Sequence, residues 1–290
     1  MGKNILFCSL PLVLVISSGC SHMVPAQVKK MPMIRVLHKE SVENISLEKY
    51  VASVLAGEVH HSWPMETLKA QAIAARTFAL LRMKERKNND YHVQNSFIDQ
   101  VLKTKPHEIL VSAARDTAGL VLSINGRLAE TSFHSTCGGV TADAKKVWGR
   151  SYPHLHGGAC GYCKSSPTFK WETELDLSDI ENKFSQKIDA IKIVSQSKDG
   201  RADVIELVGE DKKQKVSGHE FRMALGAMKV KSTLIKSLKL DGTKVKIHGG
   251  GFGHGVGMCQ YGALGMGKDN KTFQEILRHY YPGTEIKRLY

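Results

Sequence analysis

The most regular hydrophobic pattern in the chain begins at Ser46. Read as a helix capped by Ser46, the segment places Val54, Leu55 and Glu58 three, four and seven residues after Val51. These positions share one face of a helix, so the carboxyl group of Glu58 falls on the side that should be buried. Acidic side chains are rarely buried without a partner. We therefore treat Glu58 as a candidate functional residue.

A second helix is predicted over Met65–Met83. Pro64 suits the start of a helix, and the segment contains no helix breaker. Apolar side chains occupy opposite sides of this helix, which is typical of a buried helix. Lys69 and Arg76 share one line along it, and buried cations need anionic partners or a polar cleft. Either Glu58 neutralises one of these cations in a structural ion pair, or the three residues line a functional cleft.

Shorter elements flank this predicted helix pair. We expect a strand over Ile34–Leu37, a loop and strand over His92–Val101 and a helix over His107–Thr117. Asp99 in the second of these segments could face a cleft, although a structural role is the commoner one for such a residue.

A β-hairpin is predicted over Val121–Phe133, because apolar residues alternate around Asn125-Gly126. Its second strand would deliver His134, Ser135 and Cys137 to a strand end, where functional sites are usually built. A Ser-His nucleophile is disfavoured here, because adjacent residues on a strand point to opposite faces.

The segment 168–247 is more polar and basic and is expected to form a strand-rich subdomain. Alternating segments and Asp-Gly turns indicate several strands, and Ser178 with Glu181 predicts a capping box for a short helix. Its lysines are most simply a solvated face, with polymer binding as the alternative.

Nine glycines fall between Gly249 and Gly267. The run GFGHGVG lacks the strand–loop–helix context and the downstream acidic residue of a dinucleotide-binding loop, so we reject that interpretation. Glycines at this density let the backbone approach a ligand closely. His254 in this loop either clasps the loop by hydrogen bonds or contacts a substrate. Thr272 and Glu275 predict a capping box for a last helix.

The N-terminus has the features of an export signal. Lys3 precedes an apolar run from Ile5 to Ser18 that is short for a membrane span, and small residues lead to Cys20. This resembles a bacterial lipoprotein signal, with 1–19 as the signal peptide, Cys20 as the acylated residue and 20–33 as a tether. We therefore expect an exported protein, held at the cell envelope by a lipid anchor.

The composition, with 42% hydrophobic and 24% charged residues in 290, is that of a globular protein. The formal net charge of +13 suits a polyanionic partner such as a membrane surface or a cell-wall polymer, but a solvated basic surface is equally compatible. Because the chain contains no recognisable nucleic-acid-binding module, nucleic acid is not an expected partner.

Four cysteines remain after the signal peptide and Cys20 are set aside: Cys137, Cys160, Cys163 and Cys259. In an exported protein these could form two disulfides. The spacing Cys160-Gly-Tyr-Cys163 favours a zinc knuckle instead, with Cys137 as the third ligand. We expect His134 as the fourth ligand, with His154 and His156 as alternatives.

Several segments resemble the stage II sporulation protein D family, which contains peptidoglycan lytic transglycosylases and amidase enhancers. They include SLEKYVASVLAGEVHHSWPMETLKAQAIAARTFAL, GFGHGVGMCQYGA and HYYPGTEI, while HSTCGG with the C-x-x-C resembles a metal-carrying branch. The resemblance covers Ile34 to Tyr290 and is thin across 168–247. It implies that Glu58 is the catalytic acid and base. The residues expected to contact substrate are Lys69, Arg76, Ser135, His254, Gln260 and Tyr261.

The expected fold is α+β, a single domain over 34–290 with a helix pair and mixed sheets around a long substrate cleft. The expected activity is cleavage of peptidoglycan glycan strands between MurNAc and GlcNAc, leaving 1,6-anhydroMurNAc ends. Burial should raise the pKa of Glu58 above the ordinary value of about 4.3, which suits an acid. The alternatives are a non-catalytic amidase enhancer and a zinc hydrolase; three thiolates and a histidine would leave zinc no open position, which disfavours the latter.

Overall fold

The computed structural model describes residue 1 and residues 30–96, 99–210 and 212–290. Cys20, nearly all of the predicted signal peptide and most of the predicted tether therefore lie outside the described residues. None of the helices in the described ranges is both long and apolar enough to cross a bilayer. Residues Met31–Tyr290 belong to one compact unit.

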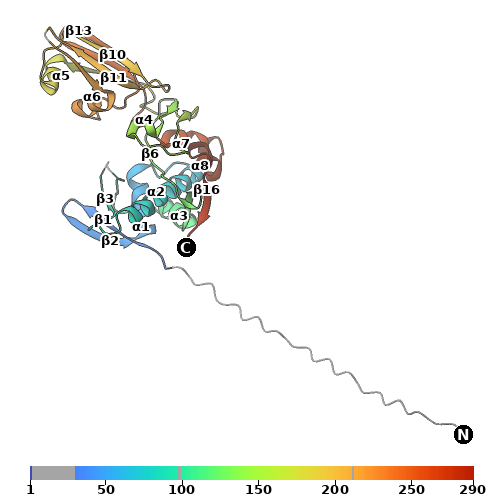
Figure 1. Ribbon diagram of the computed structural model, residues 1–290. Helices are drawn as coiled ribbons and strands as arrows, with labels where there is room; N and C mark the ends of the chain where they lie inside the picture. Colours follow the sequence, from blue (N-terminus) through green and yellow to red (C-terminus); the bar gives the residue numbers. More distant parts are fainter. Residues whose placement is uncertain (2–29, 97–98, 211) are drawn as a thin grey trace. The chain divides into compact units, whose positions relative to one another are not determined.

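The protein is α+β, as the sequence predicts (Figure 1). The described helices are α1 (Leu47–Glu58), α2 (Met65–Glu85), α3 (Glu108–Asp116), α4 (Ala144–Trp148), α5 (Leu177–Phe184), α6 (Gly218–Leu225), α7 (Gln260–Lys268) and α8 (Phe273–Tyr280). The described strands are β1 (Met33–His38), β2 (Ser41–Ser46), β3 (Val93–Gln94), β4 (Leu120–Ile124), β5 (Arg127–Leu128), β6 (Phe133–His134), β7 (Val140–Thr141), β8 (Gly158–Ala159), β9 (Trp171–Asp176), β10 (Ala190–Gln196), β11 (Ala202–Val208), β12 (Lys213–Ser217), β13 (Ile235–Asp241), β14 (Lys244–Gly249), β15 (Met258–Cys259) and β16 (Glu285–Arg288).

Helix α2 is the centre of the packing around the candidate site. It contacts α1, α3, α7 and α8. Its Leu68 and Ala72 belong to a hydrophobic cluster with α1 and β1, whereas its Ala70 and Ile73 belong to a second cluster with β4, β15 and α8. Because α2 lies between two hydrophobic clusters, its sequence is apolar on opposite sides, and the predicted buried helix is confirmed.

Two connections bring distant segments beside this helix. The hairpin of β4 and β5 turns at Asn125-Gly126, both of which have positive φ, as the sequence predicts. Strand β5 ends at Leu128, and the separate strand β6 pairs in parallel with β15. This pairing places His134 opposite Cys259 and joins the loop after β6 to the start of α7.

Residues from Trp171 to Ile247 have a hydrophobic cluster of their own. It is built from the sheets β10-β11-β12 and β13-β14-β9 together with side chains of α5 and α6. Hydrogen bonds tie this part to the glycine-rich loop: Trp171 Nε1 donates to Gly251 O at 2.8 Å, and Gly253 N donates to Lys231 O at 3.0 Å.

Candidate functional site

Glu58 is the last residue of α1, just before the loop that leads to α2. Its side chain is half-buried and is held by two donors. Val101 N donates to Oε1 at 3.1 Å, and Gln260 Nε2 donates to Oε2 at 3.1 Å. These donors come from segments 43 and 202 residues away in the chain. The fold therefore fixes the position of this carboxyl group from three separate segments.

Burial raises the pKa of Glu58, while the hydrogen bonds from Val101 and Gln260 act in the lowering direction. No lysine, arginine or histidine in the described ranges forms an ion pair with Glu58. The interpretation in which Glu58 neutralises Lys69 or Arg76 is therefore wrong. A carboxyl group with a raised pKa and no described ion-pair partner keeps its proton to a higher pH than an exposed glutamate does, which suits a general acid.

Arg76 lies elsewhere, in the core between α1, α3 and β4. It is fully buried, and its Nε and Nη2 donate to the two carboxylate oxygens of Glu48 at 2.9 and 2.6 Å. It also donates to the carbonyl oxygens of Leu120 and Ala114. Arg76 therefore has no surface to offer a ligand, and the predicted contact with substrate does not fit this position.

Lys69 and Asp99 also have local partners. Lys69 Nζ lies 3.3 Å from Glu66 Oε1 one turn earlier on α2, and its side chain is 22% exposed. Asp99 Oδ2 accepts from Arg86 at 2.7 Å and from Gln94 N at 2.8 Å, so Asp99 organises its own loop. Of these two residues, Lys69 alone keeps enough exposed surface to meet a ligand.

An aromatic pair lies next to the Glu58–Gln260 contact. Tyr261 follows Gln260 at the start of α7, and its ring packs edge-on against Trp63 with centroids 5.4 Å apart. Trp63 belongs to the loop that follows Glu58, and both rings are half-buried. Aromatic faces of this kind bind the apolar faces of sugar rings.

Ser135 and His254 support the loops beside this pair. Ser135 O accepts from Tyr261 N at 3.0 Å, and its hydroxyl lies 3.4 Å from that of Thr136. His254 Nδ1 accepts from Val256 N at 3.1 Å, and its Nε2 lies 3.0 Å from Phe133 O. Both nitrogens of His254 are thus used within the protein. Burial lowers the pKa of His254 to about 4, which keeps the imidazole neutral. These contacts match the interpretation of His254 as a clasp.

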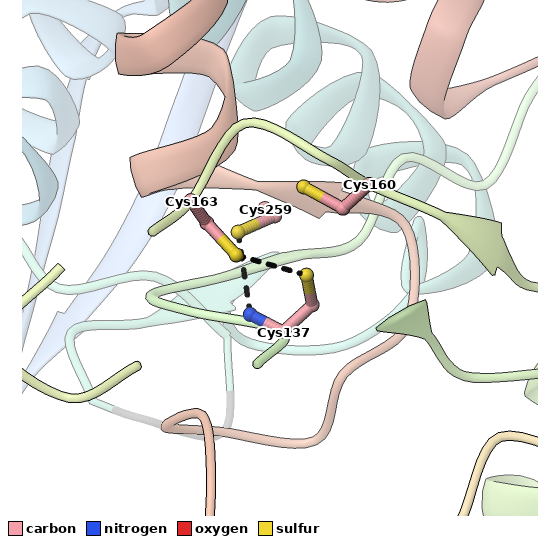
Figure 2. A group of neighbouring side chains, drawn as sticks. All are labelled: Cys137, Cys160, Cys163 and Cys259. Atoms are coloured by element: carbon pink, nitrogen blue, oxygen red, sulfur yellow. Dashed lines mark hydrogen bonds between the residues drawn. The ribbon is translucent and has the colours of Figure 1, made fainter. Parts of the chain in front are cut away.

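The cysteines form a second candidate site. Cys137, Cys160, Cys163 and Cys259 are all buried, and their sulfur atoms lie within 4.8 Å of one another. Figure 2 shows the four side chains converging, with Cys160 and Cys163 from one loop and Cys137 and Cys259 from two others. All four are free thiols, so the alternative of two disulfides is wrong.

This arrangement fits a tetrahedral metal ion. Four sulfurs at about 2.3 Å from zinc lie about 3.8 Å apart, and Cys137 Sγ lies 3.5 Å from Cys163 Sγ. Backbone N–H groups of Cys137 and Gly262 donate to Cys259 Sγ at 3.2 and 3.3 Å, as thiolate ligands require. Cys259 also caps the N-terminus of α7, because its sulfur accepts from Gly262 N in the first turn.

His134 is not the fourth member of this group, and that prediction is wrong. Its Nδ1 lies 3.0 Å from Val256 O, and Cys259 occupies the place beside the other cysteines. The two alternatives are also engaged elsewhere: His154 Nε2 lies 2.7 Å from Glu130 O, and His156 Nδ1 lies 3.1 Å from Pro153 O.

Two residues of these sites were not singled out from the sequence. Cys259 carried a usable signal, because it was one of four cysteines left after the export segment. Trp63 carried a weaker signal, because a large aromatic ring is unusual in the short polar loop that follows Glu58.

Comparisons with known proteins show which families the chain is similar to. The family model described as stage II sporulation protein matches residues 38–123, and a domain of unknown function (DUF8618) matches residues 160–257. The chain is 31% identical over 278 residues to stage II sporulation protein D of Bacillus subtilis, covering 88% of this chain and 78% of that protein. It is 34% identical over 254 residues to an uncharacterised protein of Brachyspira hyodysenteriae, covering 84% and 67%.

A more distant relative carries a different name. The amidase enhancer of Bacillus subtilis is 26% identical over 289 residues, which cover 80% of this chain and 39% of that protein. The family model covers the helix pair with Glu58, and the second model covers the part that includes Cys160, Cys163 and the glycine-rich loop. The chain belongs to the stage II sporulation protein D family.

Proposed function

We propose that the protein is a peptidoglycan lytic transglycosylase in which Glu58 is both the acid and the base. The observation that carries this proposal is the environment of Glu58: a half-buried carboxyl group with a raised pKa, two fixed donors and no ion pair with any described cation. Membership of the family supports a role in the cell wall.

The reaction needs one carboxyl group and no external water. Protonated Glu58 donates its proton to the glycosidic oxygen as the bond from that oxygen to MurNAc C1 breaks. The 6-hydroxyl oxygen of the same MurNAc attacks C1, and the Glu58 carboxylate takes the hydroxyl proton. The products are a free GlcNAc hydroxyl and a 1,6-anhydroMurNAc end, and Glu58 is again protonated. A single group can serve both steps because the proton that leaves is replaced.

The neighbouring residues supply orientation and substrate contact. Gln260 holds the carboxyl group, while Trp63 and Tyr261 offer ring faces to the sugars. Lys69 would meet a carboxylate of the substrate, and Ser135 and His254 would support the loops that line the cleft. We leave Arg76 out of the substrate contacts because it is fully buried.

The cysteine group is proposed as a structural zinc centre. Its four thiols would fill the four positions that zinc prefers, which leaves none for a water or a substrate. When bound, zinc would crosslink three segments of the chain, those of Cys137, of Cys160 with Cys163, and of Cys259, as structural zinc does in other folds. This full ligand set disfavours a zinc hydrolase.

We further propose that the protein is exported and is held at the cell envelope by a lipid on Cys20. Its partners would be glycan strands, whose carboxylates suit the net charge of +13, and an amidase that removes stem peptides beforehand. The amidase enhancer among the relatives supports the second partner.

The test is product analysis by mass. Purified peptidoglycan, intact or pretreated with an amidase, is incubated with the wild type, with Glu58→Gln and with Glu66→Gln. Glu66→Gln is the matched control, because Glu66 lies on α2 and contacts Lys69 and Phe273 N rather than Glu58. We expect 1,6-anhydro products from the wild type and the control and none from Glu58→Gln. Equal products from Glu58→Gln would refute the assignment.

The relative named an amidase enhancer favours one alternative, a glycan-binding protein that stimulates an amidase without cleaving strands. In the same assay that protein would release no anhydro products, and it would speed removal of stem peptides equally well with Glu58→Gln.

A further inference from the structure

A buried arginine from the 168–247 part contacts the loop that carries the first cysteine. Arg201 precedes β11, and its side chain is 5% exposed. Its Nη2 donates to Cys137 O at 3.2 Å and to Val140 O at 3.3 Å. Its Nε donates to Asp199 Oδ2 at 2.8 Å, while its Nη1 has no hydrogen-bond partner among the described residues.

The glycine-rich loop leaves room for this guanidinium group. A Cβ atom at Gly255 would overlap it, and Gly255 has a φ of 85°, a conformation that other residues rarely adopt. The guanidinium thus lies between the loop of Cys137 and the loop that leads to Cys259. Burial lowers the pKa of Arg201, and the charges of Asp199, Cys137 and Cys259 act in the opposite direction.

The expected negative charge of the cysteine centre explains why a buried arginine would lie beside it. Four thiolates around a divalent zinc ion carry a net charge of about −2, and such a charge is costly in a buried site unless a cation lies nearby. Two histidines lie beside the centre, His134 opposite Cys259 in the sheet and His279 against Cys160. An imidazole carries a charge only when it is protonated, whereas the guanidinium of an arginine stays charged across the working pH range.

We propose that Arg201 is the counter-cation of the metal-loaded cysteine centre and thereby couples metal binding to the docking of the 168–247 part. This inference rests on the proposed zinc site and assigns Arg201 a positioning role. Metal at the four thiolates strengthens the attraction for the guanidinium, and the docked guanidinium strengthens metal binding by the same factor. The turn from Ser197 to Arg201 is the element through which the two are linked.

The test compares metal affinity in matched variants of the whole exported chain. Cobalt(II) titration reports thiolate coordination by its absorption, and zinc competition then gives the dissociation constant. We expect Arg201→Met to weaken zinc binding by about 10- to 100-fold, the range typical of groups that support metal ligands. Arg201→Lys, which keeps the charge, should recover part of the loss. Arg222→Met is the control, since Arg222 donates to Val230 O and forms no hydrogen bond with a cysteine among the described residues.

The variant Asp199→Asn distinguishes an effect of the positive charge of Arg201 from an effect of its packing alone. If Arg201 acts as a cation, removing the carboxylate beside it leaves zinc affinity unchanged or higher. If Arg201 acts only as a steric prop, loosening it through Asp199→Asn weakens zinc binding as Arg201→Met does, and the proposal is wrong.

Amide hydrogen exchange provides a second readout that does not depend on activity. Removing zinc from the wild type should increase exchange in the turn from Ser197 to Arg201, and Arg201→Met should show fast exchange with or without metal. The coupling would be refuted if Arg201→Met bound zinc as tightly as the wild type does and if removing zinc from the wild type left amide exchange in the turn unchanged. A wild type that binds neither cobalt nor zinc would instead refute the metal site itself, and this inference with it.

Discussion

The amide of Gln260 is the side-chain donor that lowers the pKa of Glu58, so Gln260→Met tests the proposed acid directly. The hydrogen bond from Gln260 Nε2 to Glu58 Oε2 stabilises the carboxylate form. Methionine has a similar length and cannot donate, so the carboxylate loses this stabilisation and the pKa of Glu58 rises further above its ordinary value.

The expected size of the change follows from the contact. A hydrogen bond to a charged group contributes about 1.5–3 kcal/mol. At 3.1 Å and with a half-buried carboxyl group, the lower end applies. At about 1.36 kcal/mol per pKa unit, the pKa of Glu58 should rise by about one unit. A general acid works in its protonated form, so the pH above which activity falls should also rise by about one unit.

The assay is the rate of anhydro-product formation from glycan strands freed of stem peptides, measured across pH as kcat/KM. Tyr261→Phe is the control, because Tyr261 neighbours Gln260 and has no hydrogen bond to Glu58 among the described contacts. Phenylalanine keeps the aromatic ring that would contact the sugar, so KM and the upper pH limit should both stay near those of the wild type. If Gln260→Met retains activity and its upper pH limit coincides with that of the wild type, Glu58 is not the group whose protonation governs the reaction.

Four further predictions test separate parts of the account. Trp63→Ala should raise KM for the same strands about tenfold, because it loses about 1.4 kcal/mol of contact between the ring and the sugar. Trp63→Phe keeps a ring and should have a KM near that of the wild type. Equal KM values for Trp63→Ala and the wild type would exclude a sugar contact. Arg76→Met removes the cation from the mostly buried carboxylate of Glu48, which keeps only the donors Gly119 N and Tyr290 Oη. It should lower the free energy of unfolding by about 3 kcal/mol in urea titration; a loss below about 1 kcal/mol would contradict a buried pair. Elemental analysis should find zinc depleted in Cys259→Ser and retained in His134→Ala, and the reverse result would restore His134 as the ligand. Because the pKa of Glu58 is raised, its ionisation removes stability as pH rises through the folded-state pKa. The melting temperature of Glu58→Gln relative to the wild type should therefore increase from about pH 4 to pH 8, and a constant difference would show that the pKa is not raised.

The parts of the fold that depend on local sequence could be predicted. The period of apolar residues located α1 and α2 and put Glu58 on the inner face, because helix periodicity involves neighbours within two turns. The capping box of Thr272 and Glu275 forms as predicted. The box of Ser178 and Glu181 does not: the N-cap of α5 is Asp176, two residues before Ser178, and Glu181 instead accepts from Ile188 N at 3.0 Å.

The partners of the site residues could not be predicted, because they come from distant segments. Arg76 pairs with Glu48 across two helices, and nothing in the spacing distinguishes Glu48 from Glu58 as its anion. Cys259 reaches the cysteine group through the parallel pairing of β6 and β15, which places it opposite His134. The two candidates for the fourth ligand, His134 and Cys259, are neighbours in the folded sheet. The sequence alone does not show which of the two side chains points toward the metal site.

The central claim is that Glu58 alone moves the proton while the substrate's own hydroxyl attacks, and digestion in ¹⁸O-labelled water tests it most directly. The account predicts that strands cut by the wild type end in 1,6-anhydroMurNAc without heavy oxygen, and that Glu58→Gln releases no such ends. Reducing ends that carry ¹⁸O would contradict it, because they would show that water attacks the sugar and that a second group must activate it.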